Sequence, residues 1–190
     1  MYLDASDFIK RFCHYKKIVV IGNNGSGKSY LSNALAKLSG LPLVHLDLLY
    51  WRPNWVAPTK EEWVAMQREL IVKEKWIMDG NHTSTMELRY CAADVVIFLN
   101  INRFLCLISV FHRMLSGRTG FPTNLRTGWN KDTFRFLQGL WNFSKERKPL
   151  IYQLEQKYPD IPLFCIQKRR NVKAILRELN ERESGGNYNE

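Results

Sequence analysis

The sequence predicts an α/β fold built on an open parallel sheet. Short apolar, β-branched runs alternate along the chain with segments whose apolar residues recur at helical spacing. A glycine-rich turn joins the first of these runs to the first helical segment. The length of 190 residues fits one domain, and the sequence contains no internal repeat. Ligands of such folds bind at the carboxyl ends of the strands.

The elements follow one another with few breaks. Strands are expected at 17–21, 43–46, 76–78, 94–99 and 163–166. Helices are expected at 30–38, 60–73, 84–90, 103–116, 132–147, 150–157 and 171–182. Gly40 is the predicted C-cap of the first helix, and Thr59 with Glu62 forms a capping box for the second. Asn171 is the predicted N-cap of the last helix.

We expect a single domain over 1–190 with three peripheral segments. Residues 1–16 are an N-terminal extension, in which the amphipathic stretch 8–12 favours a short helix packed outside the sheet. Residues 117–131 contain glycine and proline and are polar, which is typical of a loop that could move. Residues 184–190 are expected to fray.

The loop GNNGSGKS occupies the turn between the first strand and the first helix, and it matches the phosphate-binding pattern G-x-x-x-x-G-K-[ST]. Its glycines allow successive backbone N–H groups to turn inward on an anion, and the helix N-terminus adds its positive dipole end. Lys28 is expected to reach the β and γ phosphates of a nucleotide, and the Ser29 hydroxyl to bind Mg²⁺. The predicted nucleotide-binding residues are Gly22, Asn23, Asn24, Gly25, Ser26, Gly27, Lys28, Ser29 and Tyr30.

Two carboxylates follow predicted strands and therefore point to the same edge of the sheet as this loop. Asp79 is the candidate for the metal-side carboxylate, and Asp47 for the base on the side of the phosphoryl acceptor. The two roles could be exchanged. In the alternative interpretation, each aspartate only caps the helix that follows it.

Cationic side chains surround the predicted mobile loop. Arg113 and Arg118 bracket its start and Arg126 lies inside it, where they could neutralise charge on a transferring phosphoryl group or form solvated surface. Arg89 could bind a phosphate of the acceptor or pair with Glu87 or Asp94.

Aromatic residues and late arginines give weaker indications. Trp51 and Trp55 flank the Asp47 loop and could stack on an acceptor ring or pack in the core. Trp63 and Trp76 are predicted to be core residues. The pair at 169–170 is expected mainly on the surface, with adenine or ribose contact as the alternative.

Composition limits the class of protein. The 45% apolar and 24% charged content is that of a soluble globular protein, and there is neither a membrane-spanning run nor a signal-peptide pattern, so a cytoplasmic location is expected. The four cysteines are too widely spaced to suggest a disulfide framework or zinc site. The net charge is +10, and residues 101–148 carry 9 basic and 2 acidic side chains. That stretch faces either polyphosphate in a site or nucleic acid.

Five motifs, in this order, give the chain a family resemblance: GNNGSGKS, PLVHLDLLYWRPNW, WIMDGNHTSTMELR, ADVVIFLNINR and HRMLSGR. Together they resemble the P-loop NTPases called DNA topology modulation proteins, which are related to adenylate kinase and other small nucleotide kinases. The resemblance implies a P-loop nucleotide-kinase-like three-layer fold with a five-stranded parallel sheet. It also implies Mg²⁺ and ATP at Gly22 to Ser29, and a short lid with Arg118 at its start.

Two departures from the related families concern the acceptor side and the lid. Adenylate kinases have D-G-F-P-R where this chain continues from Asp79 with Gly-Asn-His-Thr, so the arginine of that motif has no counterpart. The topology modulation proteins tend to follow G-R-T with Arg-Pro-Asp, whereas Thr119 is followed here by Gly-Phe-Pro.

The function predicted from these residues is ATP-dependent phosphoryl transfer to a small acceptor, such as a nucleotide or nucleoside. The alternative is a nucleic-acid-associated nucleotide-binding protein or ATPase whose basic segment contacts DNA and influences its topology. A third interpretation is a kinase-like fold that binds ATP without turnover.

Overall fold

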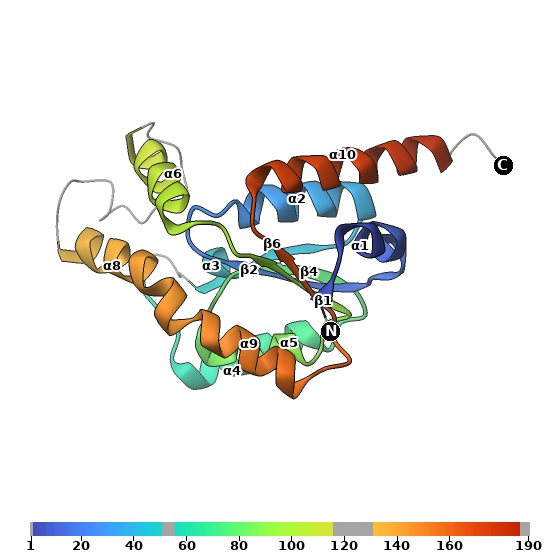
Figure 1. Cartoon of the computed structure of the whole chain (residues 1–190). Helices are drawn as coiled ribbons and strands as arrows, with labels where there is room; N and C mark the ends of the chain where they lie inside the picture. The colour runs from blue at the N-terminus through green and yellow to red at the C-terminus, as the bar shows by residue number, and fades with distance from the viewer. Residues whose placement is uncertain (1, 51–55, 116–130, 187–190) are drawn as a thin grey trace.

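The computed structural model of the chain describes residues 2–50, 56–115 and 131–186 (Figure 1). Within these residues, six strands form one parallel sheet in the order β1-β6-β5-β2-β4-β3. The strands are β1 (Tyr2–Leu3), β2 (Lys17–Gly22), β3 (Leu43–His45), β4 (Trp76–Asp79), β5 (Val95–Leu99) and β6 (Leu163–Ile166). The predicted α/β class with a parallel sheet is confirmed.

Helices connect the strands. They are α1 (Ala5–Arg11), α2 (Lys28–Ser39), α3 (Leu46–Tyr50), α4 (Lys60–Ile71), α5 (Met86–Tyr90), α6 (Arg103–Leu115), α8 (Lys131–Glu146), α9 (Lys148–Lys157) and α10 (Arg169–Gly186). Two 3-10 turns, η1 (Phe12–His14) and η3 (Thr83–Thr85), precede β2 and α5. Among the described helices, none combines the length and the apolar character that crossing a bilayer requires.

Side chains of β2 alternate between the two faces of the sheet because successive residues of a strand point in opposite directions. Ile18 and Val20 join a core formed with α1, α2 and α10. Val19 and Ile21 join a second core formed with α5 and α9. Figure 1 shows these two sets of helices on opposite faces. Burial on both faces explains the unbroken apolar runs in the strands.

The N-terminal extension adds a strand that the sequence analysis did not predict. The expected short helix is present as α1, where Phe8 and Ile9 are buried. Ahead of it, β1 pairs with β6 and raises the number of strands from the expected five to six. The Phe8 ring stacks on Phe164 of β6, with centroids 4.5 Å apart and 13° between the planes. The extension is therefore an integral edge of the sheet.

Helix ends bear out some of the predicted caps. Gly40 ends α2 in the left-handed conformation at φ 67°, and its N–H donates to the carbonyl of Ala36. Thr59 and Glu62 form the predicted capping box of α4. The prediction for Asn171 was wrong, because α10 begins at Arg169 and places this residue in its first turn.

Three predicted boundaries differ from the structure or lie outside it. The strand expected at 43–46 ends at His45, and Leu46 begins α3 with its side chain fully buried. Of the tail expected to fray at 184–190, residues 184–186 belong to α10, and 187–190 lie outside the described residues. Of the predicted lid, 117–130 also lie outside them, and Lys131 begins α8.

Candidate active site

The turn between β2 and α2 is formed by tightly packed glycines. Gly22 has φ 152° and Gly25 has φ 78°. A Cβ atom on Gly22 would lie 2.7 Å from the carbonyl oxygen of Leu99, and one on Gly25 would overlap the carbonyl oxygen of Cys106. No other residue type fits these two positions without displacing β5 or α6. The predicted glycine-rich loop therefore lies in the predicted strand–turn–helix context.

Lys28 lies in the first turn of α2, and only 7% of the residue is exposed. Its Nζ donates to the carbonyl oxygen of Asn23 at 3.2 Å. Burial lowers the pKa of Lys28, and the negative charges of Asp47 and Asp79 oppose this shift. A cation held in this way is short of hydrogen-bond acceptors, and the oxygens of a bound phosphate would supply them.

Asparagines connect the loop to the rest of the site. The Asn23 side chain donates to the carbonyl of Leu140 in α8 at 2.9 Å, and its Oδ1 accepts from the N–H of Asn24. The Gly22 N–H donates to Oδ1 of Asn81 at 3.1 Å. The turn after β4 and the helix after the predicted lid are thus both bonded to the phosphate loop.

Asp79 is the last residue of β4, as predicted, and its side chain is only 3% exposed. It lies opposite His45 in the register between β3 and β4. Its Oδ2 is 2.8 Å from Nδ1 of His45. The pairing orients one carboxylate oxygen of Asp79 and leaves the other, Oδ1, for a further ligand.

Asp47 was predicted at the end of a strand. It lies instead in the first turn of the five-residue helix α3. Its side chain is 64% exposed, and its Oδ1 lies 3.0 Å from Nε2 of His82. Desolvation acts to raise the pKa of Asp47, but the His82 hydrogen bond and the charges of Lys28 and His45 outweigh it and lower that pKa. Asp47 is therefore an accessible, ionised carboxylate at neutral pH.

Arg89 is fully buried in α5. Its guanidinium donates to Gln67 Oε1 at 2.6 Å, to Thr85, and to the carbonyls of Gly80 and Asn81. The alternative predicted pairing with Glu87 or Asp94 is not found: Glu87 accepts from Lys157 and Tyr158, and the Asp94 carboxylate accepts from the N–H groups of residues 16 and 17. Burial lowers the pKa of Arg89 to about 9. Arg89 therefore joins the turn after β4 to α4 and η3.

Other predicted site residues fall in three groups. Ser29 and Tyr30 are exposed in the first turn of α2, and Ser26 is buried in the loop. Arg113 is exposed in the last turn of α6, and its charge acts on the pKa of Lys28. Trp51, Trp55, Arg118 and Arg126 lie outside the described residues.

Arg169, the first residue of α10, supports the phosphate loop. It donates to the carbonyl of Gly25 at 2.7 Å and to that of Leu105 at 2.9 Å. The neighbouring Arg170 is exposed. Trp63 and Trp76 are buried, as predicted.

His45, His82 and Asn81 belong to the site but were not predicted from the sequence as site residues. A usable signal was present, because a histidine lies two residues before Asp47 and another lies three residues after Asp79. In neighbouring parallel strands such residues meet at one edge.

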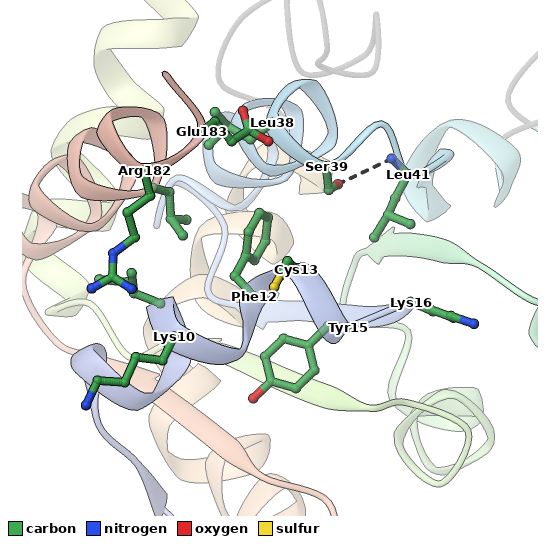
Figure 2. Close-up of a pocket in the computed structure, with 12 residues that line it drawn as sticks. Lys10, Phe12, Cys13, Tyr15, Lys16, Leu38, Ser39, Leu41, Arg182 and Glu183 are labelled. Carbon is green, nitrogen blue, oxygen red and sulfur yellow. Dashed lines mark hydrogen bonds between the residues drawn. The ribbon is translucent and has the colours of Figure 1, made fainter. Parts of the chain in front are cut away.

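A separate cavity of about 430 Å³ lies at the opposite end of α2 (Figure 2). Phe12, Tyr15 and Leu179 contribute apolar lining, and Lys10, Lys16, Arg182 and Glu183 contribute charged groups. Lys28 and Ser39 are the two ends of α2, a 12-residue helix that spans about 18 Å. The cavity is therefore not part of the site around the phosphate loop.

Comparison with known proteins identifies the fold. No model of a protein family matches the sequence, and no curated protein matches it significantly. Among solved structures, a shikimate kinase from Acinetobacter baumannii in complex with shikimate is similar with a TM-score of 0.58 and 16% identity, covering 92% of this chain and 98% of that one. A shikimate kinase from Bacteroides thetaiotaomicron is similar with a TM-score of 0.55 and 15% identity, covering 90% and 99%. A gluconokinase from Sinorhizobium meliloti has a TM-score of 0.49 and 18% identity, covering 86% of this chain and 89% of that one. The two shikimate kinases show that the chain shares their α/β fold.

Proposed function

We propose that this protein is a kinase that transfers the γ-phosphoryl group of Mg²⁺·ATP to a hydroxyl or phosphate oxygen of a small acceptor. The observation that carries the proposal is the convergence of three groups at one edge of the sheet: buried Lys28 after β2, Asp79 at the end of the neighbouring β4, and Asp47 just after β3. Phosphoryl transfer depends mainly on positioning and on stabilising charge, and these groups suit both tasks.

The nucleotide side of the site fits ATP and Mg²⁺. Lys28 has one hydrogen-bond acceptor in Asn23 and is buried, so phosphate oxygens would complete its contacts. Ser29 and Asp79 offer a hydroxyl and a carboxylate, and oxygen ligands of this kind are the ones Mg²⁺ prefers. The ion would screen the charge of the transferring phosphoryl group.

The acceptor side is assigned to Asp47, which is accessible and ionised. It would orient the acceptor hydroxyl and take up its proton as the bond to phosphorus forms. Arg113 and Arg118 would stabilise the charge that spreads over the phosphoryl oxygens, and Trp51 would contact the acceptor. The contacts of Arg89 favour a supporting role for that residue over acceptor binding.

The acceptor class is proposed from two sources. The similar structures include a kinase that holds shikimate, which supports a small-molecule acceptor. The sequence motifs shared with the topology modulation proteins support a place among the nucleotide kinases and keep a nucleotide or nucleoside in the panel below. Membership of that narrower family rests on the motifs alone.

The test is ADP release from Mg²⁺·ATP with a panel of nucleosides, nucleoside monophosphates, hydroxy acids, sugars and duplex DNA. Lys28→Ala is the inactive variant, and Lys37→Ala, at an exposed position of the same helix, is the matched control. We expect one small acceptor to stimulate ADP release in the wild type and in Lys37→Ala. In Lys28→Ala the stimulated rate of ADP release should fall at least about a hundredfold. Stimulation by DNA alone would overturn the proposal in favour of the nucleic-acid-associated alternative.

A further inference from the structure

His82 has an unusual backbone conformation. Its φ of 29° and ψ of 72° make it the one non-glycine residue with positive φ in the described part of the chain. Such a conformation is unfavourable for a residue with a side chain and persists where the surroundings impose it. Here the His82 carbonyl accepts from the N–H of Thr85 at 3.1 Å and from its hydroxyl at 3.3 Å. Strain of this kind is often found at functional sites.

The imidazole of His82 packs against two aromatic rings. Its centroid lies 4.7 Å from that of Tyr50 and 4.9 Å from that of Trp63. The Tyr50 and Trp63 rings are themselves in edge contact at 5.1 Å and 85°. The His82 side chain is 15% exposed, whereas that of its partner Asp47 is 64% exposed. The histidine is thus the fixed member of the pair and the aspartate the accessible one.

The hydrogen bond between them has a defined direction. An ionised carboxylate can only accept, so Nε2 of His82 carries the hydrogen and donates to Oδ1 of Asp47 at 3.0 Å. Oδ2 of Asp47 remains available to a hydroxyl. A short exposed side chain without such a donor would sample several rotamers.

We propose that His82 is a positioning residue that aims Asp47 at the hydroxyl of the acceptor. The inference rests on the proposed kinase function and concerns the same site. In the reaction, the acceptor oxygen forms a bond to the γ-phosphorus, the bond from that phosphorus to the β,γ-bridging oxygen breaks, and ADP leaves. Asp47 takes the hydroxyl proton, and His82 keeps its own hydrogen throughout.

Charges on the neighbouring elements act on Asp47 in the same direction. Lys28 on α2, His45 on β3 and His82 before η3 all lower its pKa, against desolvation, which raises it. On α5, the negative charge of Asp47 acts to raise the pKa of the buried Arg89, against desolvation, which lowers it. Loss of the His82 donor should therefore raise the pKa of Asp47 and move the acid limb of the kcat profile to higher pH.

Two substitutions at position 82 separate the hydrogen bond from the ring. In His82→Gln, the amide nitrogen lies about as far along the side chain as Nε2 and can replace it as donor. In His82→Asn, the amide ends at the position of Nδ1, and asparagine tolerates positive φ better than most residues. His14→Asn, at an exposed position in η1, is the control.

Expected results differ between the variants. His82→Asn should lower kcat at neutral pH by about tenfold or more, with KM for ATP unchanged and the acid limb shifted upward. His82→Gln should keep most of the wild-type kcat, and the acid limb of its pH profile should lie at the wild-type position. Equal losses in both variants with an unshifted limb would show that His82 only packs the turn, and wild-type behaviour of His82→Asn would show that it positions nothing. Either result overturns the inference.

A readout that needs no turnover keeps this test separate from the proposed function. The ¹³C resonance of the Asp47 carboxyl carbon, assigned by its absence in Asp47→Asn, is titrated in the wild type and both variants. The midpoint should rise in His82→Asn and stay near wild type in His82→Gln. If it does so while no acceptor is phosphorylated, the contact from His82 to Asp47 stands and the kinase proposal fails. An unchanged midpoint in His82→Asn contradicts the contact itself.

Discussion

Lys28 shows how a residue can favour function at the expense of stability. Its ammonium group is buried and donates to the carbonyl oxygen of Asn23. The lowered pKa means that the folded state holds this proton less tightly than the unfolded state does. As pH rises from the folded pKa to the ordinary value for lysine, the free energy of unfolding should therefore increase through this group.

Lys28→Met tests this account. Methionine has nearly the same volume and no charge, so the variant should unfold at a higher temperature at neutral pH, with a gain of about 1–2 kcal/mol. It should also fail to bind ATP. Thermal unfolding without nucleotide, followed from pH 7 to 10, and calorimetric titration with Mg²⁺·ATP measure the two effects. Lys37→Met is the matched control, and a lower melting temperature for Lys28→Met than for this control would contradict the argument.

Arg89 illustrates a residue whose burial the sequence did not reveal. On a short amphipathic helix an arginine is ordinarily exposed, and the sequence suggested either a phosphate ligand or an ion pair. The structure instead directs its fork of donors to two carbonyls of one turn and to side chains of α4 and η3. The planar fork carries five donors on three nitrogens and can reach acceptors that lie apart, whereas the three donors of a lysine are all on one nitrogen.

Arg89→Lys should therefore destabilise the protein by about 3 kcal/mol, because two or three buried acceptors lose their donor. Arg177→Lys, at an exposed i,i+4 ion pair in α10, is the control and should change stability by less than about 0.5 kcal/mol. Urea unfolding monitored by circular dichroism gives both values. Unaltered stability combined with a raised KM for the acceptor would instead return Arg89 to the role of an acceptor ligand.

At the scale of elements, the sequence predicted most strands from their unbroken apolar runs and most helices from the helical spacing of their apolar residues. It failed where elements are short. Two residues of β1 cannot show a period, and α3 was read as the end of a strand because Leu46 continues the apolar run of β3. Leu46 packs closely against Gly80: a Cβ atom on Gly80 would lie 2.9 Å from the Cβ atom of Leu46. Such a contact between distant segments leaves no local pattern.

The candidate site divides in the same way. Gly22 to Ser29 could be predicted because one contiguous motif contains every required residue type. The pairs His45 with Asp79 and His82 with Asp47 join residues 34 and 35 positions apart. Only the order of strands in the sheet brings these residues together, and that order is not encoded in any one segment.

The packing of α1 on β6 gives a test at this scale. Phe8→Ala removes the ring that stacks on Phe164 and should cost about 3–5 kcal/mol, as for other buried phenylalanines. Phe134→Ala, where 68% of the residue is exposed, is the comparison and should be nearly neutral. The measurement is the midpoint of urea unfolding. A small effect of Phe8→Ala would show that the extension contributes little to the core it covers.

For the molecule as a whole, the phosphate loop is where several layers meet. It is bonded to α8 through Asn23, to the turn after β4 through Gly22, and to the start of α10 through Arg169, which also bonds to α6. Elements from both faces of the sheet therefore set the position of one loop.

Removing one of these ties should weaken nucleotide binding without touching the nucleotide. Arg169→Met should raise the Kd for Mg²⁺·ATP about tenfold, because the hydrogen bond to Gly25 of the loop is lost together with the bond to Leu105 that ties Arg169 to α6. Arg170→Met, one residue away and exposed, should leave Kd within about twofold. Calorimetric titration of both variants decides the matter. Equal Kd values would show that the loop keeps its shape unaided.

The two histidine–aspartate pairs have a consequence for exchanging parts between related enzymes. The segment 43–50 provides a histidine for the aspartate of the segment 79–82, and the second segment provides one in return. Neither segment is complete alone, so a chimera that imports one from another kinase would leave an orphaned carboxylate on each side. Grafts that carry both segments together should keep the site intact. The two segments at this edge of the sheet should therefore be exchanged together.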